Sequence, residues 1–128
     1  MAANSDALII FCELNEKTFH LINKQVLFVL GKRGVIVNVA RGAIIDEKEM
    51  VRCLREGEIG GVGLDVFEDE PNVPKELYEL DNGDVSPHSA NKTLEAVEEA
   101  EKIMIENIKA FFSDKSLLNL VLDSRQWK

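Results

Sequence analysis

The sequence has few basic residues for its acidic content. Lysine and arginine total 15 against 23 aspartate and glutamate residues, so the formal net charge is −8. Proteins that bind nucleic acid normally carry clustered basic residues, and no such cluster occurs along this sequence. The same deficit disfavours an anionic membrane surface. We therefore expect neither a nucleic acid nor a membrane as a partner.

Cysteine is also scarce, and the marks of secreted proteins are missing. Two thiols, Cys12 and Cys53, are too few for a disulfide framework and favour a reducing compartment. The first six residues carry no basic group, and the apolar run over residues 7–11 is too short for a signal sequence or a membrane span. Two isolated histidines lack the ligand spacing of a zinc site. We expect a cytoplasmic protein without a bound metal.

The chain does contain enough apolar residues for one core. Hydrophobic residues make up 45% and charged residues 30% of its 128 residues, a composition typical of globular proteins. A chain of this length forms at most one domain.

Short apolar runs alternate with amphipathic segments along the chain. Such runs suit strands that are buried on both faces of a parallel sheet and joined by right-handed crossovers. We predict strands over residues 7–12, 34–40, 59–66 and 83–86. We predict helices over residues 16–23, 25–30, 46–56 and 92–112, with N-caps at Asn15 and Asp46 and stops at Gly31 and Gly57. The expected fold class is α/β: a parallel sheet with flanking helices and a long C-terminal helix.

Polar residues follow three of these strands at the point where each strand ends. Arg41 follows the second run, Asp65 and Glu70 follow the third, and His88 follows the fourth. The carboxyl ends of parallel strands share one edge of the sheet, where ligands bind. A cation, two carboxylates and an imidazole therefore converge there, which suits proton transfer beside an anionic substrate.

Each of these residues also has a plainer interpretation. Arg41 either pairs with a surface carboxylate in a turn or clamps a substrate carboxylate, for which its planar guanidinium is suited. His88 is either a surface residue or a general acid–base group. Glu70 is either an ordinary loop carboxylate or the acceptor that favours a charged His88. Asp65 either caps a turn or accepts hydrogen bonds from a ligand amide, and we interpret His20 as structural, within a helix.

Three stretches carry a family resemblance. They are Val-Asn-Val-Ala-Arg-Gly-Ala-Ile-Ile-Asp-Glu over residues 37–47, Gly-Val-Gly-Leu-Asp-Val-Phe-Glu-Asp-Glu-Pro over 61–71, and Ser-Pro-His-Ser-Ala over 86–90. In this order they resemble the D-isomer-specific 2-hydroxyacid dehydrogenases. Within that family the chain looks most like the plant hydroxypyruvate/glyoxylate reductases and the hydroxyphenylpyruvate reductases. The resemblance runs from about residue 2 to residue 121.

The resemblance implies catalytic roles. Arg41 matches the arginine that holds the carboxylate of the 2-oxo acid, and His88 matches the histidine that protonates its carbonyl oxygen. Glu70 matches the carboxylate that keeps this histidine charged. Hydride addition builds an alkoxide, which a proton donor and a cation stabilise.

The resemblance also implies a dinucleotide site. The cofactor is NADP or NAD, with NADPH favoured, the substrate is a small 2-oxo acid, and the complete enzyme is expected to be a homodimer. The positions that match cofactor-lining residues are Cys12, Val39, Ala40, Arg41, Asp65, His88, Ser89 and Ala90.

One part of the family pattern is missing. The Gly-x-Gly-x-x-Gly turn that holds the pyrophosphate does not occur in the sequence. We therefore expect residues 1–112 to form the carboxyl half of a Rossmann-like domain and residues 113–128 a tail that in relatives returns to the substrate domain. Such a chain should bind dinucleotide weakly and show little or no activity alone. A glycine and a charge at Gly83–Asp84 should also weaken the strand before His88.

Two alternatives stay open. The half-domain is either part of a reductase or a non-catalytic interaction module that pairs with itself or an intact paralogue through an unpaired strand edge. A different parallel α/β ligand-binding domain, such as a flavodoxin-like one, leaves the spacing of these polar residues unexplained.

Overall fold

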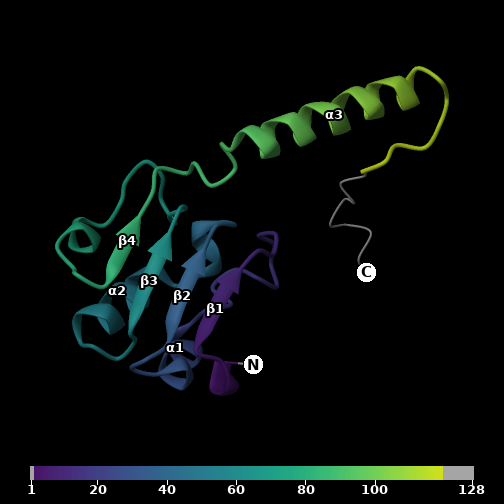
Figure 1. Cartoon of the computed structure of the whole chain (residues 1–128). Helices are drawn as coiled ribbons and strands as arrows, with labels where there is room; N and C mark the ends of the chain where they lie inside the picture. Colours follow the sequence, from purple (N-terminus) through teal and green to yellow (C-terminus); the bar gives the residue numbers. More distant parts are fainter. Residues whose placement is uncertain (1, 120–128) are drawn as a thin grey trace. The chain divides into compact units, whose positions relative to one another are not determined.

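A four-stranded parallel sheet forms the centre of the fold in the computed structural model, which describes residues 2–119 (Figure 1). The strands lie side by side in sequence order. They are β1 (Ala7–Ile10), β2 (Val35–Asn38), β3 (Gly61–Leu64) and β4 (Gly83–Val85). Every neighbouring pair is parallel. The predicted α/β class with a parallel sheet is therefore confirmed, with strands shorter than expected.

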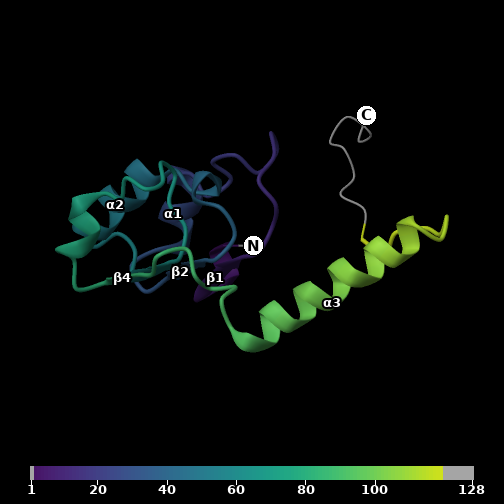
Figure 2. The same ribbon diagram turned by 90° about the horizontal axis from the view of Figure 1, so that it is seen from above.

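Two α-helices connect the strands and lie on the same face of the sheet (Figure 2). They are α1 (Lys24–Leu30) and α2 (Glu47–Arg55). Three short 3-10 helices complete this part of the fold: η1 (Ala2–Asn4), η2 (Gly42–Ile44) and η3 (Lys75–Tyr78). The core lies between the helices and the sheet, and its fully buried side chains include Leu27, Ile36, Ile44, Met50 and Ile59.

Local sequence explains where both helices begin and end. The Asn23 side chain accepts from the Gln25 and Val26 amides of α1, and the Asp46 side chain accepts from the Glu49 amide at 3.2 Å. Gly31 and Gly57 follow the helices with φ angles of 76° and 64°. Glycine adopts this left-handed conformation without strain, so the two predicted helix stops are confirmed.

The predicted helix over residues 16–23 is wrong. The Asn15 side chain accepts from the Lys17 amide at 2.9 Å and so forms a local turn instead of a helix cap. His20 has a φ of 47°, which interrupts any helix. Ile22 then pairs in parallel with Ile45 and is buried. Tertiary pairing with the segment after β2 therefore overrides the local helix signal.

The expectation of a weakened β4 rests on a wrong premise. Asp84 is exposed, and β4 pairs only on its β3 side among the described residues. All three residues of β4 pair with β3, and Asp84 lies opposite Gly63. A charge at an exposed edge position costs little, so the strand keeps its full pairing.

A long helix, α3 (Leu94–Phe111), belongs to a second compact unit that begins at Ala90. The Thr93 side chain caps it by accepting from the Ala96 amide at 3.2 Å. This confirms the predicted C-terminal helix, whereas the first compact unit ends at Ser89. Residues 120–128 of the expected tail lie outside the described residues. Within the described part of the chain, no helix combines the length and hydrophobicity needed to cross a membrane.

Candidate functional site

The loop after β2 is held by a buried asparagine. Asn38, with no exposed surface, donates its side-chain amide to the Arg41 carbonyl at 2.9 Å and accepts from the Ala40 amide at 3.0 Å. These two bonds fix the backbone that presents Arg41, whose side chain is exposed and donates to the Ala40 carbonyl at 2.6 Å. The sequence analysis missed Asn38, although a polar residue inside an apolar strand was a visible signal.

Gly42 allows two loops to meet. A Cβ atom at this position would lie 1.9 Å from the Phe67 carbonyl carbon and 2.3 Å from the Glu68 amide nitrogen. Any larger residue would push the loops apart. Gly42 thus lets the Arg41 loop pack against the backbone of the segment that leads to Glu70.

A histidine–carboxylate pair follows this segment. His88 Nδ1 lies 2.8 Å from Glu70 Oε2, and Glu70 Oε1 accepts from the Phe67 amide at 3.0 Å. Hydrogen bonds from His88 and from the Phe67 amide lower the pKa of Glu70 from its ordinary value, and the charges of His88 and Arg41 lower it further. Since an ionised carboxylate only accepts, Nδ1 carries a proton and Nε2 is the nitrogen that can serve a ligand.

The structure thus brings the three predicted catalytic side chains to one edge of the sheet. Glu70 is hydrogen-bonded to His88, and the charge of Arg41 contributes to the lowered pKa of Glu70.

Asp65 holds the loop that contains His88. Its carboxylate is 4% exposed, and Oδ1 accepts from the Ser86 hydroxyl at 2.6 Å and from the Ser89 amide at 2.7 Å. These two contacts bracket His88, whose φ is 49°. A residue other than glycine needs such support in the left-handed region. Asp65 therefore caps a turn, one of the two roles expected of it.

An open hollow of about 450 Å³ adjoins the pair. Apolar side chains make up much of its wall. It is lined by Phe67, Glu70, Pro71, Val73, Tyr78, Val85, Ser86, Pro87 and His88.

The remaining predicted cofactor-lining residues follow the strand ends. Cys12 is exposed and lies two residues past β1, and Val39 and Ala40 are half-buried directly after β2. Ser89 is half-buried beside Asp65. Ala90 is the first residue of the second compact unit. Cys12, Val39, Ala40 and Ser89 thus follow strand ends, as expected.

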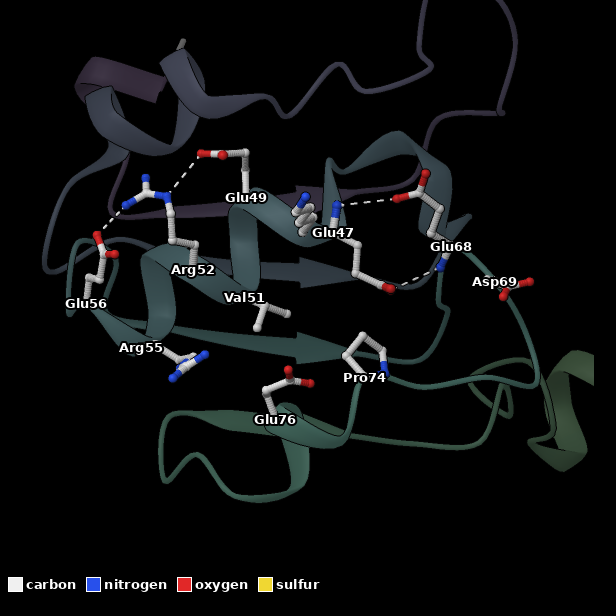
Figure 3. A pocket seen from close by; sticks show the side chains of 11 residues that line it. Glu47, Glu49, Val51, Arg52, Arg55, Glu56, Glu68, Asp69, Pro74 and Glu76 are labelled. Carbon is white, nitrogen blue, oxygen red and sulfur yellow. Dashed lines mark hydrogen bonds and ion pairs between the residues drawn. The ribbon is translucent and has the colours of Figure 1, made fainter.

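A second histidine–glutamate pair lies in the same loops, and the sequence analysis did not anticipate it. His20 Nε2 lies 2.9 Å from Glu68 Oε1. Glu68 also exchanges backbone-to-side-chain hydrogen bonds with Glu47 at 3.0 Å and 3.4 Å (Figure 3). Burial raises the pKa of Glu47, and the neighbouring charges of Glu68 and Asp69 add to that rise. His20 is therefore part of a turn contact between loops and not of a helix.

Another hollow, of about 800 Å³, is lined by none of the catalytic candidates. Figure 3 shows that α2 supplies much of its wall, with Pro74 and Glu76 across from it. The Arg52 guanidinium pairs there with Glu49 and Glu56. Within residues 2–119, no group of three or more His, Cys, Asp or Glu side chains could hold a metal ion.

Comparison with known proteins places these observations in a family. The profile described as D-isomer specific 2-hydroxyacid dehydrogenase, NAD binding domain, matches residues 1–90. The glyoxylate/hydroxypyruvate reductase HPR3 of Arabidopsis thaliana is 51% identical over 121 residues, which are 94% of this chain and 38% of that protein. The hydroxyphenylpyruvate reductase of Plectranthus scutellarioides is 43% identical over 95% of this chain and 39% of its own length.

Solved structures of 2-hydroxyacid dehydrogenases are also similar to this chain. The NADPH-dependent glyoxylate/hydroxypyruvate reductase of Sinorhizobium meliloti, in complex with NADP and malonate, superposes with a TM-score of 0.84 at 38% identity. That match covers 92% of this chain and 37% of the reductase. The apo D-mandelate dehydrogenase of Rhodotorula graminis gives a TM-score of 0.86 at 31% identity, over 95% of this chain and 36% of its own. The chain therefore spans less than two-fifths of the length of these relatives.

Proposed function

Because the chain belongs to the D-isomer specific 2-hydroxyacid dehydrogenases, through their NAD-binding domain, we propose that it carries the substrate-binding and proton-transfer residues of an NAD(P)H-dependent reductase. Its substrates are 2-oxo acids of the kind named for its relatives: glyoxylate, hydroxypyruvate or hydroxyphenylpyruvate. The observation that carries the proposal is the Glu70–His88 contact of 2.8 Å, on a carboxylate that Arg41 also influences.

Arg41 binds the substrate carboxylate in this proposal. One N–H of its guanidinium is engaged with the Ala40 carbonyl, and the planar group offers further donors for a bidentate contact. The exposed side chain stands on a loop that Asn38 and the close approach at Gly42 hold in place. A cation at this point also stabilises negative charge that develops on the carbonyl oxygen.

His88 supplies the proton. Its Nδ1–H is donated to Glu70, which leaves Nε2–H of the charged imidazole to protonate the oxygen as the carbonyl is reduced. Glu70 accepts the Nδ1–H bond, and its lowered pKa keeps this acceptor ionised.

The residues fit one end of a dinucleotide. Strand ends on one edge present Cys12, Val39, Ala40 and Ser89, and this is the edge at which parallel α/β sheets bind nucleotides. The bound dinucleotide supplies the hydride. The glycine-rich turn that holds a pyrophosphate is not in this sequence, so we propose that the 128-residue chain binds NADPH weakly and reduces little or no substrate alone. Calorimetric binding of NADPH at micromolar affinity would contradict this.

The activity is tested by joining the chain to the upstream part of the Arabidopsis thaliana relative, which is 51% identical over the shared region. We expect the joined protein to oxidise NADPH with hydroxypyruvate or glyoxylate and to lose this activity on Arg41→Ala. The same assay on the unjoined chain measures its own contribution. A folded joined protein without turnover, or turnover that is unaffected by Arg41→Ala, would contradict the proposal.

We also propose a compartment and an oligomeric state for the protein. Cys12 and Cys53 are both free thiols, one exposed and one buried, which suits the reducing cytoplasm. We propose that the complete enzyme is a homodimer and that it uses neither nucleic acid nor a membrane.

One observation favours a second candidate, an interaction module. Ile9 on β1 is 61% exposed and Phe11 just beyond it is 77% exposed. An apolar strand that pairs on one side only is a template for another chain. Such a module would elute as a concentration-dependent oligomer and would show no turnover when joined to an intact upstream part.

A further inference from the structure

His20 and Glu68 form a pair that the proposed reaction does not use. Their side chains are 31% and 33% exposed, and the Nε2-to-Oε1 distance is 2.9 Å. Since the ionised carboxylate only accepts, His20 Nε2 carries the proton in this contact. The imidazole also stacks on Phe19, with ring centroids 4.0 Å apart. The ring is therefore fixed on two sides, as expected of a side chain that holds other groups in place.

The backbone of His20 is hydrogen-bonded to the loop that contains Arg41. Its amide donates to the Ala43 carbonyl at 2.9 Å, and the Ile22 amide donates to the Ile44 carbonyl at 3.0 Å. Ala43 lies two residues after Arg41. Whatever side chain stands at position 20, these backbone contacts remain, so a substitution removes the imidazole contact alone.

The other partner belongs to the segment that carries Glu70. Glu68 lies two residues before Glu70. Phe67, which precedes Glu68, donates its amide to Glu70. Glu47, at the start of α2, accepts from the Glu68 amide and donates its own amide to Glu68 Oε2 (Figure 3). Glu68 thus connects the three segments that follow β1, β2 and β3.

We infer that His20 is a positioning residue, whose imidazole links the Arg41 loop to residues 67–70 and so sets the separation of the Arg41 guanidinium from the Glu70–His88 pair. Three sets of contacts hold these segments together: the backbone approach at Gly42, the mutual hydrogen bonds of Glu47 and Glu68, and the His20–Glu68 hydrogen bond. The first two join the segments after β2 and β3 directly, and the third adds a link through the segment after β1, whose backbone also bonds to Ala43. The geometric claim stands alone, and its catalytic consequence rests on the proposed function.

The test measures how strongly Arg41 acts on Glu70. The Glu70 carboxyl of the 128-residue chain, labelled with ¹³C, is titrated by NMR with and without Arg41→Gln. Loss of the guanidinium should raise the pKa of Glu70, since the Arg41 charge contributes to its lowering. The same substitution is then made in His20 variants, which completes a double-mutant cycle.

The variants are matched for fold. Asparagine tolerates the left-handed region in which His20 lies but is too short to reach Glu68, so His20→Asn breaks the contact. His20→Gln keeps a donor with the longer reach. We expect Arg41→Gln to raise the Glu70 pKa by less than half as much in His20→Asn as in the wild-type chain, and by a similar amount in His20→Gln.

Two outcomes would overturn the inference in different ways. If Arg41→Gln raises the Glu70 pKa equally in the wild-type chain and in His20→Asn, the positioning role fails while the proposed function stands. If Arg41→Gln has no effect in the wild-type chain, the two groups are not coupled and the proposed site fails as well. Glu68→Ala removes the same contact from the other side, together with the bond from the Glu47 amide, without touching the positive-φ residue, and repeats the test should His20→Asn not fold.

Discussion

Two histidine–glutamate pairs stand in neighbouring loops, and their local chemistry is nearly the same. His20–Glu68 and His88–Glu70 have contacts of 2.9 Å and 2.8 Å, and both histidines have positive φ angles, of 47° and 49°. Their surroundings differ. The Glu68 carboxylate is hydrogen-bonded to His20 and to the Glu47 amide, whereas His88 and Glu70 line an open hollow that can admit a ligand. We propose that this pair of side chains holds loops together in one place and transfers a proton in the other.

The largest expected effect separates the two histidines. His88→Asn removes the proton donor and should lower turnover of the joined reductase by about 10²- to 10⁴-fold, the usual contribution of a general acid. His20→Asn leaves the donor in place and should cost far less. Steady-state rates with hydroxypyruvate measure both. Equal losses in the two variants would erase the distinction between brace and catalyst.

Arg41→Ala should cause the second-largest loss of turnover. Loss of a group that stabilises developing charge typically lowers kcat by about 10²- to 10³-fold. Arg41→Lys keeps the charge but not the planar fork, so it should recover only part of the loss. Separate measurement of kcat and KM for the two variants tests this. Full recovery by lysine would show that geometry at this position is unimportant.

A third comparison concerns acid stability. The folded-state pKa of Glu70 is lowered, so its contacts stabilise the fold above the ordinary carboxyl pKa and are lost as pH falls through the lowered value. Glu70→Gln removes this contribution, and its unfolding midpoint should therefore fall less steeply between neutral and acidic pH than that of the wild-type chain. Urea titrations across that range measure the slope. Parallel slopes would mean that His88 and Phe67 do not hold Glu70 in solution.

A smaller effect is expected at the loop that carries His88. Ser86→Ala removes the hydroxyl that donates to Asp65 Oδ1 and should destabilise the fold by about 1 kcal/mol, the net value of a typical hydrogen bond. Chemical denaturation of the two proteins gives the difference. Activity of the joined reductase should fall with it, because the same loop places the imidazole. A stability change without any change in activity would limit Asp65 to a structural role.

The smallest effect concerns the two thiols. Burial, together with a hydrogen bond to Glu58, raises the pKa of Cys53 to about 11, whereas Cys12 is exposed. The thiolate is the reactive species, so iodoacetamide at neutral pH should modify Cys12 and leave Cys53 intact in the folded chain. Peptide mass spectrometry locates the label. Modification of Cys53 would show that α2 opens readily.

The sequence predicted features with local causes. The helix cap at Asp46 and the stops at Gly31 and Gly57 follow from side-chain and φ preferences within a few residues. The parallel sheet followed from continuous apolar runs. Arg41, Glu70 and His88 were identified because each follows a strand end, and that position alone brings distant residues together in a parallel sheet.

Features with tertiary causes escaped the sequence. The helix expected over residues 16–23 is absent because Ile22 pairs with Ile45, a contact no local preference encodes. Asp84 was expected to be buried, and only the sheet order shows that it lies at an exposed edge. The His20–Glu68 contact joins residues 48 positions apart and lies in loops. Pattern analysis of single segments cannot pair such residues.

The most direct test asks whether one small molecule touches both sides of the site. Oxamate, an unreactive isostere of a 2-oxo acid, is titrated into the labelled chain while the Arg41 Nε–H and His88 imidazole signals are followed by NMR. The account predicts that both signals move with the same Kd, and that Arg41→Ala abolishes the change at His88. Movement at one residue only, or a change at His88 that survives Arg41→Ala, would contradict it.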